Sequence, residues 1–207
     1  MLKAVREYLS FAGVQYRNPD KAGDEREKML NLRQKGQEAR KSFTELAKTF
    51  QASHPEWQLQ QTSQWMNQAQ RLRPHFWAYL QRDGQVTEPM MALRLYGAPT
   101  DFGVSLEVSF IERKKDEQTL DKQSKILEIP VVEGMYYLAY TDGQSYRIEC
   151  TEKNRRTLRE KVQNQEIRKV LVKADVSFIE NQSVEAILEK LEDAYTLLLP
   201  YYEVTRG

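Results

Sequence analysis

Two alternating segments between residues 89 and 114 constrain the fold more than any other part of the sequence. Their apolar members are Met91, Leu93 and Leu95 in the first segment, and Leu106, Val108 and Phe110 in the second. Polar residues occupy most of the positions between them. A period of two is typical of a β-strand with one face buried. The sequence therefore predicts two antiparallel strands, interrupted at residues 98–103.

The apolar faces of these two strands also predict their register. We align Leu95 with Leu106, because side chains of one kind then share one face of the sheet. The partners that follow are Leu93 with Val108, Met91 with Phe110, Arg94 with Glu107, and Glu88 with Arg113. Each of the two charged pairs is expected to contribute roughly 0.2–1 kcal/mol relative to an alanine pair.

Asp101 and the run Glu112-Arg113-Lys114 resemble the D…ExK pattern of the PD-(D/E)xK nuclease family, over three residues. The resemblance implies a metal-dependent phosphodiesterase that uses Glu112 and Lys114, with two carboxylates on Mg²⁺. Asp101 and Glu112, however, lie roughly 36 Å apart if they occupy opposite ends of one strand. Carboxylates that share Mg²⁺ each lie ~2.1 Å from it. The nuclease is therefore the alternative hypothesis, and whether the protein is an enzyme stays open.

Composition excludes several classes of site. The chain has 207 residues, one cysteine, two histidines and a net charge of +1. It cannot form an internal disulfide or a His/Cys zinc site, and the lone Cys150 fits a reducing, cytoplasmic compartment. No apolar run approaches the ~20 residues of a membrane helix. Phosphate-binding glycine motifs are absent. We therefore predict no membrane association, no cofactor and no metal, although a carboxylate-bound metal stays open.

The N-terminal part is predicted to be helical. A short helix is expected at residues 2–11 and a long one at 24–52. The long helix has inward positions spaced alternately by three and four, which are Met29, Leu32, Gly36, Ala39, Phe43, Leu46 and Phe50. This 29–50 seam fits either a helical hairpin within the chain or a homodimer. A capping box at Ser53–Glu56 predicts a further helix to about Leu72. Residues 76–80 fit either a last helical turn or an edge strand, and the helical turn is favoured because it continues the pattern.

The remaining chain alternates strands and helices. Helices are expected from Asp116 to Leu127, from Thr151 to about Gln165 and from Ser183 to Pro200. Asp142-Gly143 predicts a hairpin turn within 135–150, and residues 170–178 form a fifth strand. The fold prediction is α+β: a helical N-terminal subdomain (1–82) precedes an antiparallel sheet of about five strands in the order ββαββαβα (83–207), with helices on one face. One continuous domain is the alternative.

A basic and aromatic surface is the main functional prediction. Its binding residues are Arg94, Glu107, Tyr136, Tyr140, Arg147, Arg155, Arg156 and Arg159. Such a surface suits single-stranded nucleic acid or phosphorylated ligands, unless the acidic last helix neutralises the basic segment 153–173. The sequence thus favours a non-catalytic cytoplasmic binding protein with a nucleic-acid or protein partner. His54, His75 and Cys150 are not expected to be catalytic.

Overall fold

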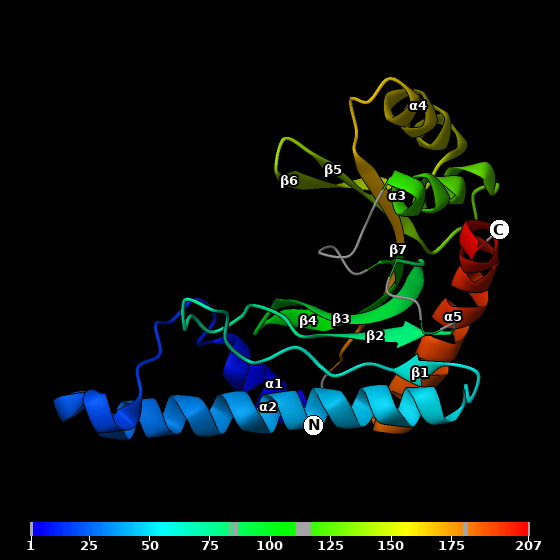
Figure 1. The fold of residues 1–207 in the computed structure, drawn as a ribbon. Helices are drawn as coiled ribbons and strands as arrows, with labels where there is room; N and C mark the ends of the chain where they lie inside the picture. The colour runs from blue at the N-terminus through cyan, green and yellow to red at the C-terminus, as the bar shows by residue number, and fades with distance from the viewer. Residues whose placement is uncertain (1, 83, 85–86, 111–116, 180–181, 207) are drawn as a thin grey trace.

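The computed structural model describes residues 2–82, 84, 87–110, 117–179 and 182–206 (Figure 1). In chain order the elements are α1 (Leu2–Leu9), η1 (Pro19–Lys21), η2 (Gly23–Glu25), α2 (Arg26–Ala52), β1 (Gln58–Leu59), β2 (Trp77–Gln81), β3 (Met90–Ala98), β4 (Asp101–Ser109), α3 (Glu117–Ser124), η4 (Lys125–Glu128), β5 (Tyr136–Thr141), β6 (Gln144–Glu149), α4 (Glu152–Gln163), β7 (Lys169–Ser177) and α5 (Val184–Arg206).

The strands form one seven-stranded sheet in the order β1-β2-β3-β4-β7-β5-β6. Every neighbouring pair is antiparallel. The predicted α+β class with an antiparallel sheet is confirmed, but the sheet has seven strands where about five were expected. The two additional strands, β1 and β2, come from the N-terminal part. The sheet is therefore continuous across the boundary expected between residues 82 and 83.

The helix predicted from Ser53 to Leu72 is wrong, and residues 76–80 follow the strand alternative rather than the favoured helical turn. Ser53 is the C-cap of α2 and not the start of a new helix. Trp57, Trp65 and Leu72 are buried as expected, but they reach the core from an irregular segment that contains only the short strand β1. In β2, buried Ala78 and Leu80 alternate with half-buried Trp77 and Tyr79. The positions of Trp57, Trp65 and Leu72 in the sequence thus resemble the spacing of a helix, although these side chains are buried by tertiary packing.

The register of the central hairpin differs from the prediction by two residues. Leu93 pairs with Leu106, Met91 with Val108 and Leu95 with Val104. The strands extend to Ala98 and Asp101, which pair with each other and leave a two-residue turn. Gly97 permits this tight turn: its φ is +96°, and a Cβ there would lie 2.1 Å from the carbonyl oxygen of Asp101. A two-residue shift keeps every side chain on its expected face.

The shift changes the predicted partners of the hairpin. Met91 does not face Phe110, and Arg94 lies directly opposite Ser105. Arg113 lies outside the described residues. Its predicted partner Glu88 accepts hydrogen bonds from Lys122 Nζ at 2.7 and 2.6 Å.

The seam of α2 is buried within the chain, as are all of its predicted inward residues. Helix α1 packs on α2. Gly36 lies directly under the ring of Trp65, and a Cβ at this position would come within 2.5 Å of that ring. A homodimer through the 29–50 seam stays a prediction, and it would have to displace these intramolecular contacts.

The C-terminal half follows the predicted order. Asp142 (φ 50°) and Gly143 (φ 76°) form the two-residue turn between β5 and β6, with the positive angles that a type I′ turn requires. Thr151 caps α4 by accepting a hydrogen bond from the backbone N of Asn154. The expected end of the last helix at Pro200 is wrong, because α5 continues to Arg206 with Pro200 inside it. Asp116, the expected cap of α3, lies outside the described residues.

The helices of the described chain pack on one face of the sheet (Figure 1). Helix α5 contacts β4 and β7, and α3 contacts both β7 and α5. The core lies between these helices and the alternating apolar residues of the strands, such as Leu93, Leu106 and Val172. We call the opposite side of the sheet the helix-free face.

Candidate functional site: a basic and aromatic sheet face

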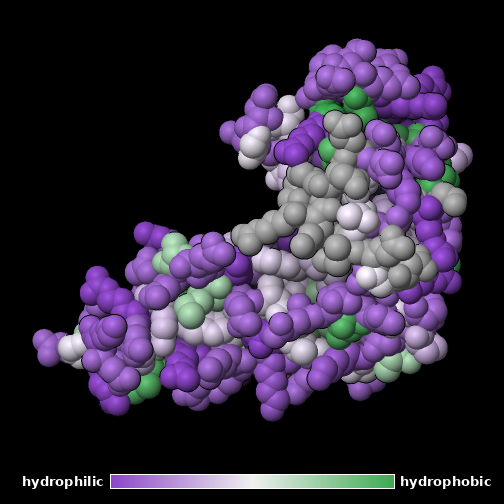
Figure 2. Space-filling view, viewed as in Figure 1, coloured by the Kyte–Doolittle hydropathy of each residue, from purple (hydrophilic) through white to green (hydrophobic). Residues whose placement is uncertain are grey.

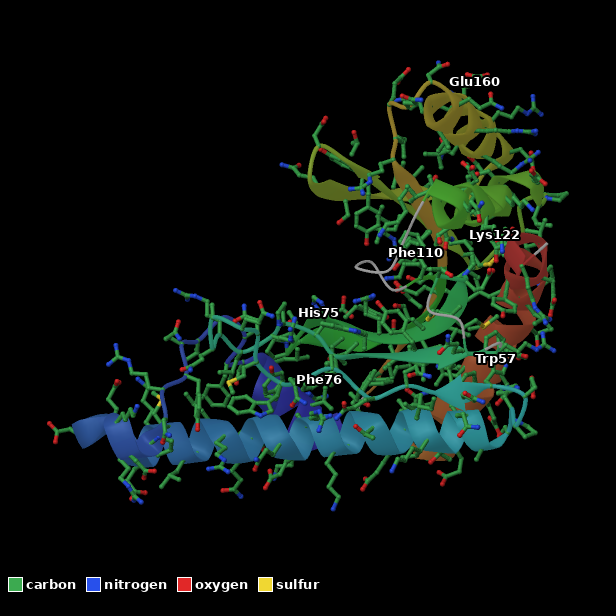
Figure 3. All side chains as sticks on the ribbon, in the orientation of Figure 1. Trp57, His75, Phe76, Phe110, Lys122 and Glu160 are labelled. Carbon is green, nitrogen blue, oxygen red and sulfur yellow. The ribbon has the colours of Figure 1, made fainter. Side chains whose placement is uncertain are left out.

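A hollow of about 400 Å³ lies on the helix-free face. Its lining side chains come from β2, β3, β4, β5 and β7 or the residues next to them: Arg73, His75, Trp77, Tyr79, Arg94, Ser109, Phe110, Leu138, Tyr140, Lys169, Leu171 and Lys173. Figure 3 shows His75 and Phe110 on opposite sides of this hollow, whereas Phe76 points towards α2. Hydrophilic residues dominate the coloured part of the molecular surface that Figure 2 shows.

Strand pairing explains why these residues meet. One row across the sheet runs through Tyr79, Ala92, Glu107, Lys173 and Tyr136, each directly opposite the next. Side chains at alternate positions of a strand point to the same face. Residues two positions away along each strand therefore join the same surface.

Glu107 occupies the centre of this face and is fully buried. Its carboxylate accepts hydrogen bonds from Arg94 Nη2 at 2.9 Å and Nε at 3.1 Å, and Lys173 Nζ lies 2.8 Å from it. Burial alone would raise the pKa of Glu107, but the charges and hydrogen bonds of Arg94 and Lys173 outweigh it and lower that pKa to about 2. Two cations thus share one anion, and the cluster keeps a net positive charge.

Aromatic rings on this face lie against cations. Trp77 has the guanidinium of Arg73 at 4.7 Å from its ring centroid and that of Arg94 at 5.5 Å. The ammonium of Lys169 lies 4.0 Å from the ring of Tyr140 and 4.9 Å from that of Phe110. Cation–π attraction of this kind contributes roughly 0.5–2 kcal/mol and orients both groups.

Tyr136 belongs to a second charged cluster beside Glu107. Its hydroxyl donates to Asp175 Oδ1 at 3.0 Å, and Arg147 Nη1 donates to Asp175 Oδ2 at 2.7 Å. The guanidinium of Arg147 also lies 3.5 Å from the Tyr136 ring centroid. Burial, followed by the nearby Asp175, raises the pKa of Tyr136, so its hydroxyl keeps its proton. Arg147 has 63% of its side chain exposed and can contact a ligand.

His75 borders the hollow beside Trp77, with ring centroids 5.6 Å apart. Burial lowers the pKa of His75 to about 4, and the neighbouring charges of Arg94 and Arg73 act in the same direction. The imidazole is therefore neutral at pH 7. It offers a ring and one hydrogen-bond donor, but no charge.

The structure brings together five of the eight predicted binding residues. Arg94, Glu107, Tyr136, Tyr140 and Arg147 all lie on the helix-free face.

The other three predicted residues, on α4, do not join them. Arg155 Nη1 donates to the carbonyl of Leu127, and its Nε and Nη2 donate to Glu152. Arg155 therefore holds α4 in place. Arg156 and Arg159 are exposed on the same helix.

Sequence reasoning missed Arg73, His75, Trp77, Lys169 and Lys173. Part of the site could have been found from the sequence, because Arg73, His75, Trp77 and Tyr79 occupy every second position, as side chains on one face of a strand do. This period of two was overlooked because residues 76–80 were assigned to a helix. Lys173 was recognised as part of a strand, but its place opposite Glu107 depends on the pairing of β4 with β7.

Two acidic residues of α5 pair with the N-terminal part of the chain and not with α4. Glu192 pairs with His54 at 2.8 Å, and Glu203 pairs with Arg82 at 2.5 Å. Both partners belong to the N-terminal part of the chain. The lone Cys150 is half-buried, and burial raises the pKa of its thiol, which disfavours a reactive thiolate.

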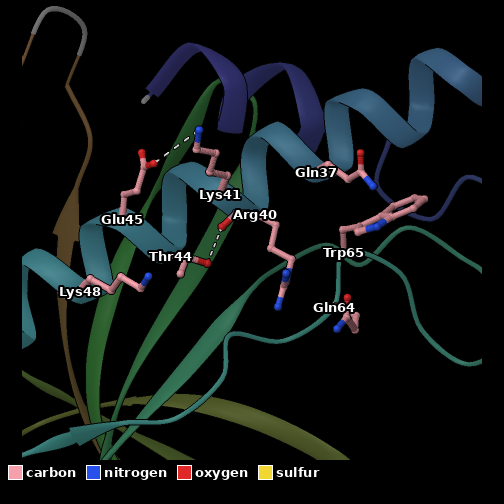
Figure 4. Close-up of a pocket in the computed structure, with 8 residues that line it drawn as sticks. All are labelled: Gln37, Arg40, Lys41, Thr44, Glu45, Lys48, Gln64 and Trp65. Carbon is pink, nitrogen blue, oxygen red and sulfur yellow. Dashed lines mark hydrogen bonds and ion pairs between the residues drawn. The ribbon is translucent and has the colours of Figure 1, made fainter.

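A second hollow, of about 360 Å³, lies on α2 (Figure 4). Arg40 points from α2 into the adjacent segment, where it donates to the carbonyls of Ser63 and Thr62 at 3.0 and 2.9 Å. Lys41 lies 3.9 Å from Glu45. Because its arginine is already bonded to backbone carbonyls, this hollow is weaker as a ligand site than the helix-free face.

The predicted nuclease residues Glu112 and Lys114 lie outside the described residues. Asp101 is exposed at the first position of β4, roughly 26 Å along the strand from Ser109. Among the residues that the structure describes, no three His, Cys, Asp or Glu side chains are grouped to hold a metal ion. Of the helices in the described ranges, none is long and apolar enough to span a membrane.

No protein-family model matches this chain, and no curated protein matches it as a relative.

Proposed function

We propose that this is a non-catalytic binding protein that holds phosphate-bearing ligands on its helix-free face. The observation that carries the proposal is the cluster at Glu107, where Arg94 and Lys173 together exceed the charge of the one carboxylate. Cations that neighbouring groups already hold in place bind phosphate at a lower entropic cost than flexible surface lysines, because little side-chain ordering is required on binding. The single cysteine supports a cytoplasmic setting for this activity.

The cations around the cluster support the same proposal. Arg73, Arg147 and Lys169 each lie against an aromatic ring, which limits where their charges can point. The net charge of the whole chain is only +1, so the attraction is local to this face. Binding is therefore expected to depend strongly on salt and on these particular side chains.

A fluorescent (dT)20 strand provides the first test, with binding followed by anisotropy over a range of salt concentrations. The double variant Arg147→Gln/Lys169→Gln should weaken binding and reduce the slope of log K against log salt by about 1.4, which is two single-strand phosphate contacts. The matched control is Arg156→Gln/Arg159→Gln, which removes two exposed charges from α4. The control should bind like the parent protein.

Two results would overturn the proposal. One is the absence of binding at low salt. The other is an equal loss of affinity in both double variants, which would indicate general attraction to charge. Thermal unfolding of each variant verifies that any loss of binding is not a loss of folding.

A further inference from the structure

Aromatic rings lie on both sides of the charged centre of the helix-free face. Trp77 is on β2 and Tyr140 is on β5, with β3, β4 and β7 between them. Both side chains nevertheless line the same hollow. Both rings are partly exposed, and each has a cation beside it. The charges of Arg94 and Lys173 lie between the two rings.

This order of groups fits a ligand that presents flat rings and negative charges in regular alternation. A nucleobase offers its face to an aromatic side chain, and the adjoining phosphate meets the neighbouring cation. Inorganic phosphate or a phosphorylated side chain would contact the cations but would not stack on the rings. Resting on the proposed function, we infer that the ligand of this face is single-stranded nucleic acid, with bases stacked on Trp77 and Tyr140.

The inference specifies a single strand because the faces of paired bases are covered by their neighbours in a duplex.

The decisive comparison uses the full chain with (dT)20 and with an abasic phosphodiester strand of the same length. The two probes carry the same charge and differ in their bases. Stacking contributes about 1–3 kcal/mol per base, so (dT)20 should bind at least about tenfold more tightly than the abasic strand. Trp77→Leu and Tyr140→Leu should each reduce the ratio of (dT)20 affinity to abasic-strand affinity.

The outcomes separate this inference from the proposed function. Equal affinity for (dT)20 and the abasic strand would overturn the stacking inference and leave phosphate binding in place. No binding of either strand would overturn both. If a blunt duplex of equal length bound more tightly than (dT)20, the inference of single-strand recognition would be rejected, and the proposed phosphate binding would be unaffected.

Tryptophan fluorescence gives a second readout that does not depend on affinity. The chain has three tryptophans, and Trp57 and Trp65 are buried on the core side, at 1% and 7% exposure. Only Trp77 borders the hollow. Saturation with (dT)20 should quench emission in the parent protein and not in Trp77→Phe. Undiminished quenching in Trp77→Phe would contradict stacking at this position, as would saturation of the parent without quenching.

Discussion

Arg94 forms its ion pair with Glu107 diagonally across two strands, because its direct partner in the register is Ser105. The guanidinium uses both Nε and Nη2, at 3.1 and 2.9 Å from Oε1. This diagonal leaves the position beside Glu107 on β7 to Lys173, which lies directly opposite. The fully buried carboxylate of Glu107 is thus paired with cations from two strands, Arg94 of β3 and Lys173 of β7.

Replacing Glu107 by glutamine should be severely destabilising. Glu107→Gln leaves the buried Lys173 and the half-buried Arg94 without their counter-charge, and breaking a buried pair in this way typically costs about 3–5 kcal/mol. The free energy of unfolding in urea measures the effect. Glu45→Gln is the control, because Glu45 is 63% exposed and 3.9 Å from Lys41, and exposed pairs of this kind contribute little. Similar unfolding curves for the two variants would refute the account of the cluster.

Stability should fall as the pH decreases from about 6.5 to about 4, partly because of His75. The pKa of His75 is about 4 in the folded protein against 6.5 ordinarily. Between these values the unfolded chain binds a proton that the folded protein does not, so acid favours unfolding. His75→Gln should weaken this part of the pH dependence when urea unfolding is compared at pH 7 and pH 5. An NMR titration that gives His75 an ordinary pKa would contradict the prediction.

Gly36→Ala should destabilise the protein, although alanine is the better helix former. The intrinsic gain in a helix is about 1 kcal/mol, whereas a Cβ only 2.5 Å from the Trp65 ring overpacks the core at a cost of about 1–3 kcal/mol. In a Trp65→Leu background the same change should become neutral or stabilising. Thermal unfolding of the four proteins in this cycle checks both signs. A higher melting temperature for Gly36→Ala alone would show that the ring adjusts freely.

Pro200→Ala should stabilise α5. Proline cannot donate a backbone hydrogen bond to the carbonyl of Thr196, and its ring crowds that turn. Pro200 is exposed, so its removal opens no cavity in the core. The expected gain is up to about 3 kcal/mol, seen as a higher urea midpoint. Asp193→Ala, at another exposed position of α5, is the matched control and should change the midpoint less.

Short sequence patterns correctly predicted the elements whose structure depends on neighbouring residues, such as turns and amphipathic helices. Asp142-Gly143 was sufficient to place the β5–β6 turn, and the spacing from Met29 to Phe50 was sufficient to place α2. Residues 76–80 failed because both faces of β2 carry apolar or aromatic side chains, and an apolar run of that length does not distinguish a strand from a helical turn.

The sequence predicted the site residues that lie on the β3–β4 and β5–β6 hairpins, because both strands of a hairpin are neighbours in the sequence. Arg94 and Glu107 were paired correctly as charges, although their register was displaced by two residues. Such a shift keeps both faces intact, so the apolar pattern cannot detect it; the length of the turn decides the register. The contribution of Lys173 needed knowledge that β7 lies beside β4, which no local pattern contains.

Successive side chains of each strand point alternately to the core and to the helix-free face, so the two sets can be changed independently. In β4, Leu106 and Val108 hold the helices, while Ser105, Glu107 and Ser109 belong to the other side. The second set can therefore be exchanged on an unaltered scaffold. For engineering, a library restricted to every second residue of β2, β5 and β7 would vary the proposed binding face while sparing the interior.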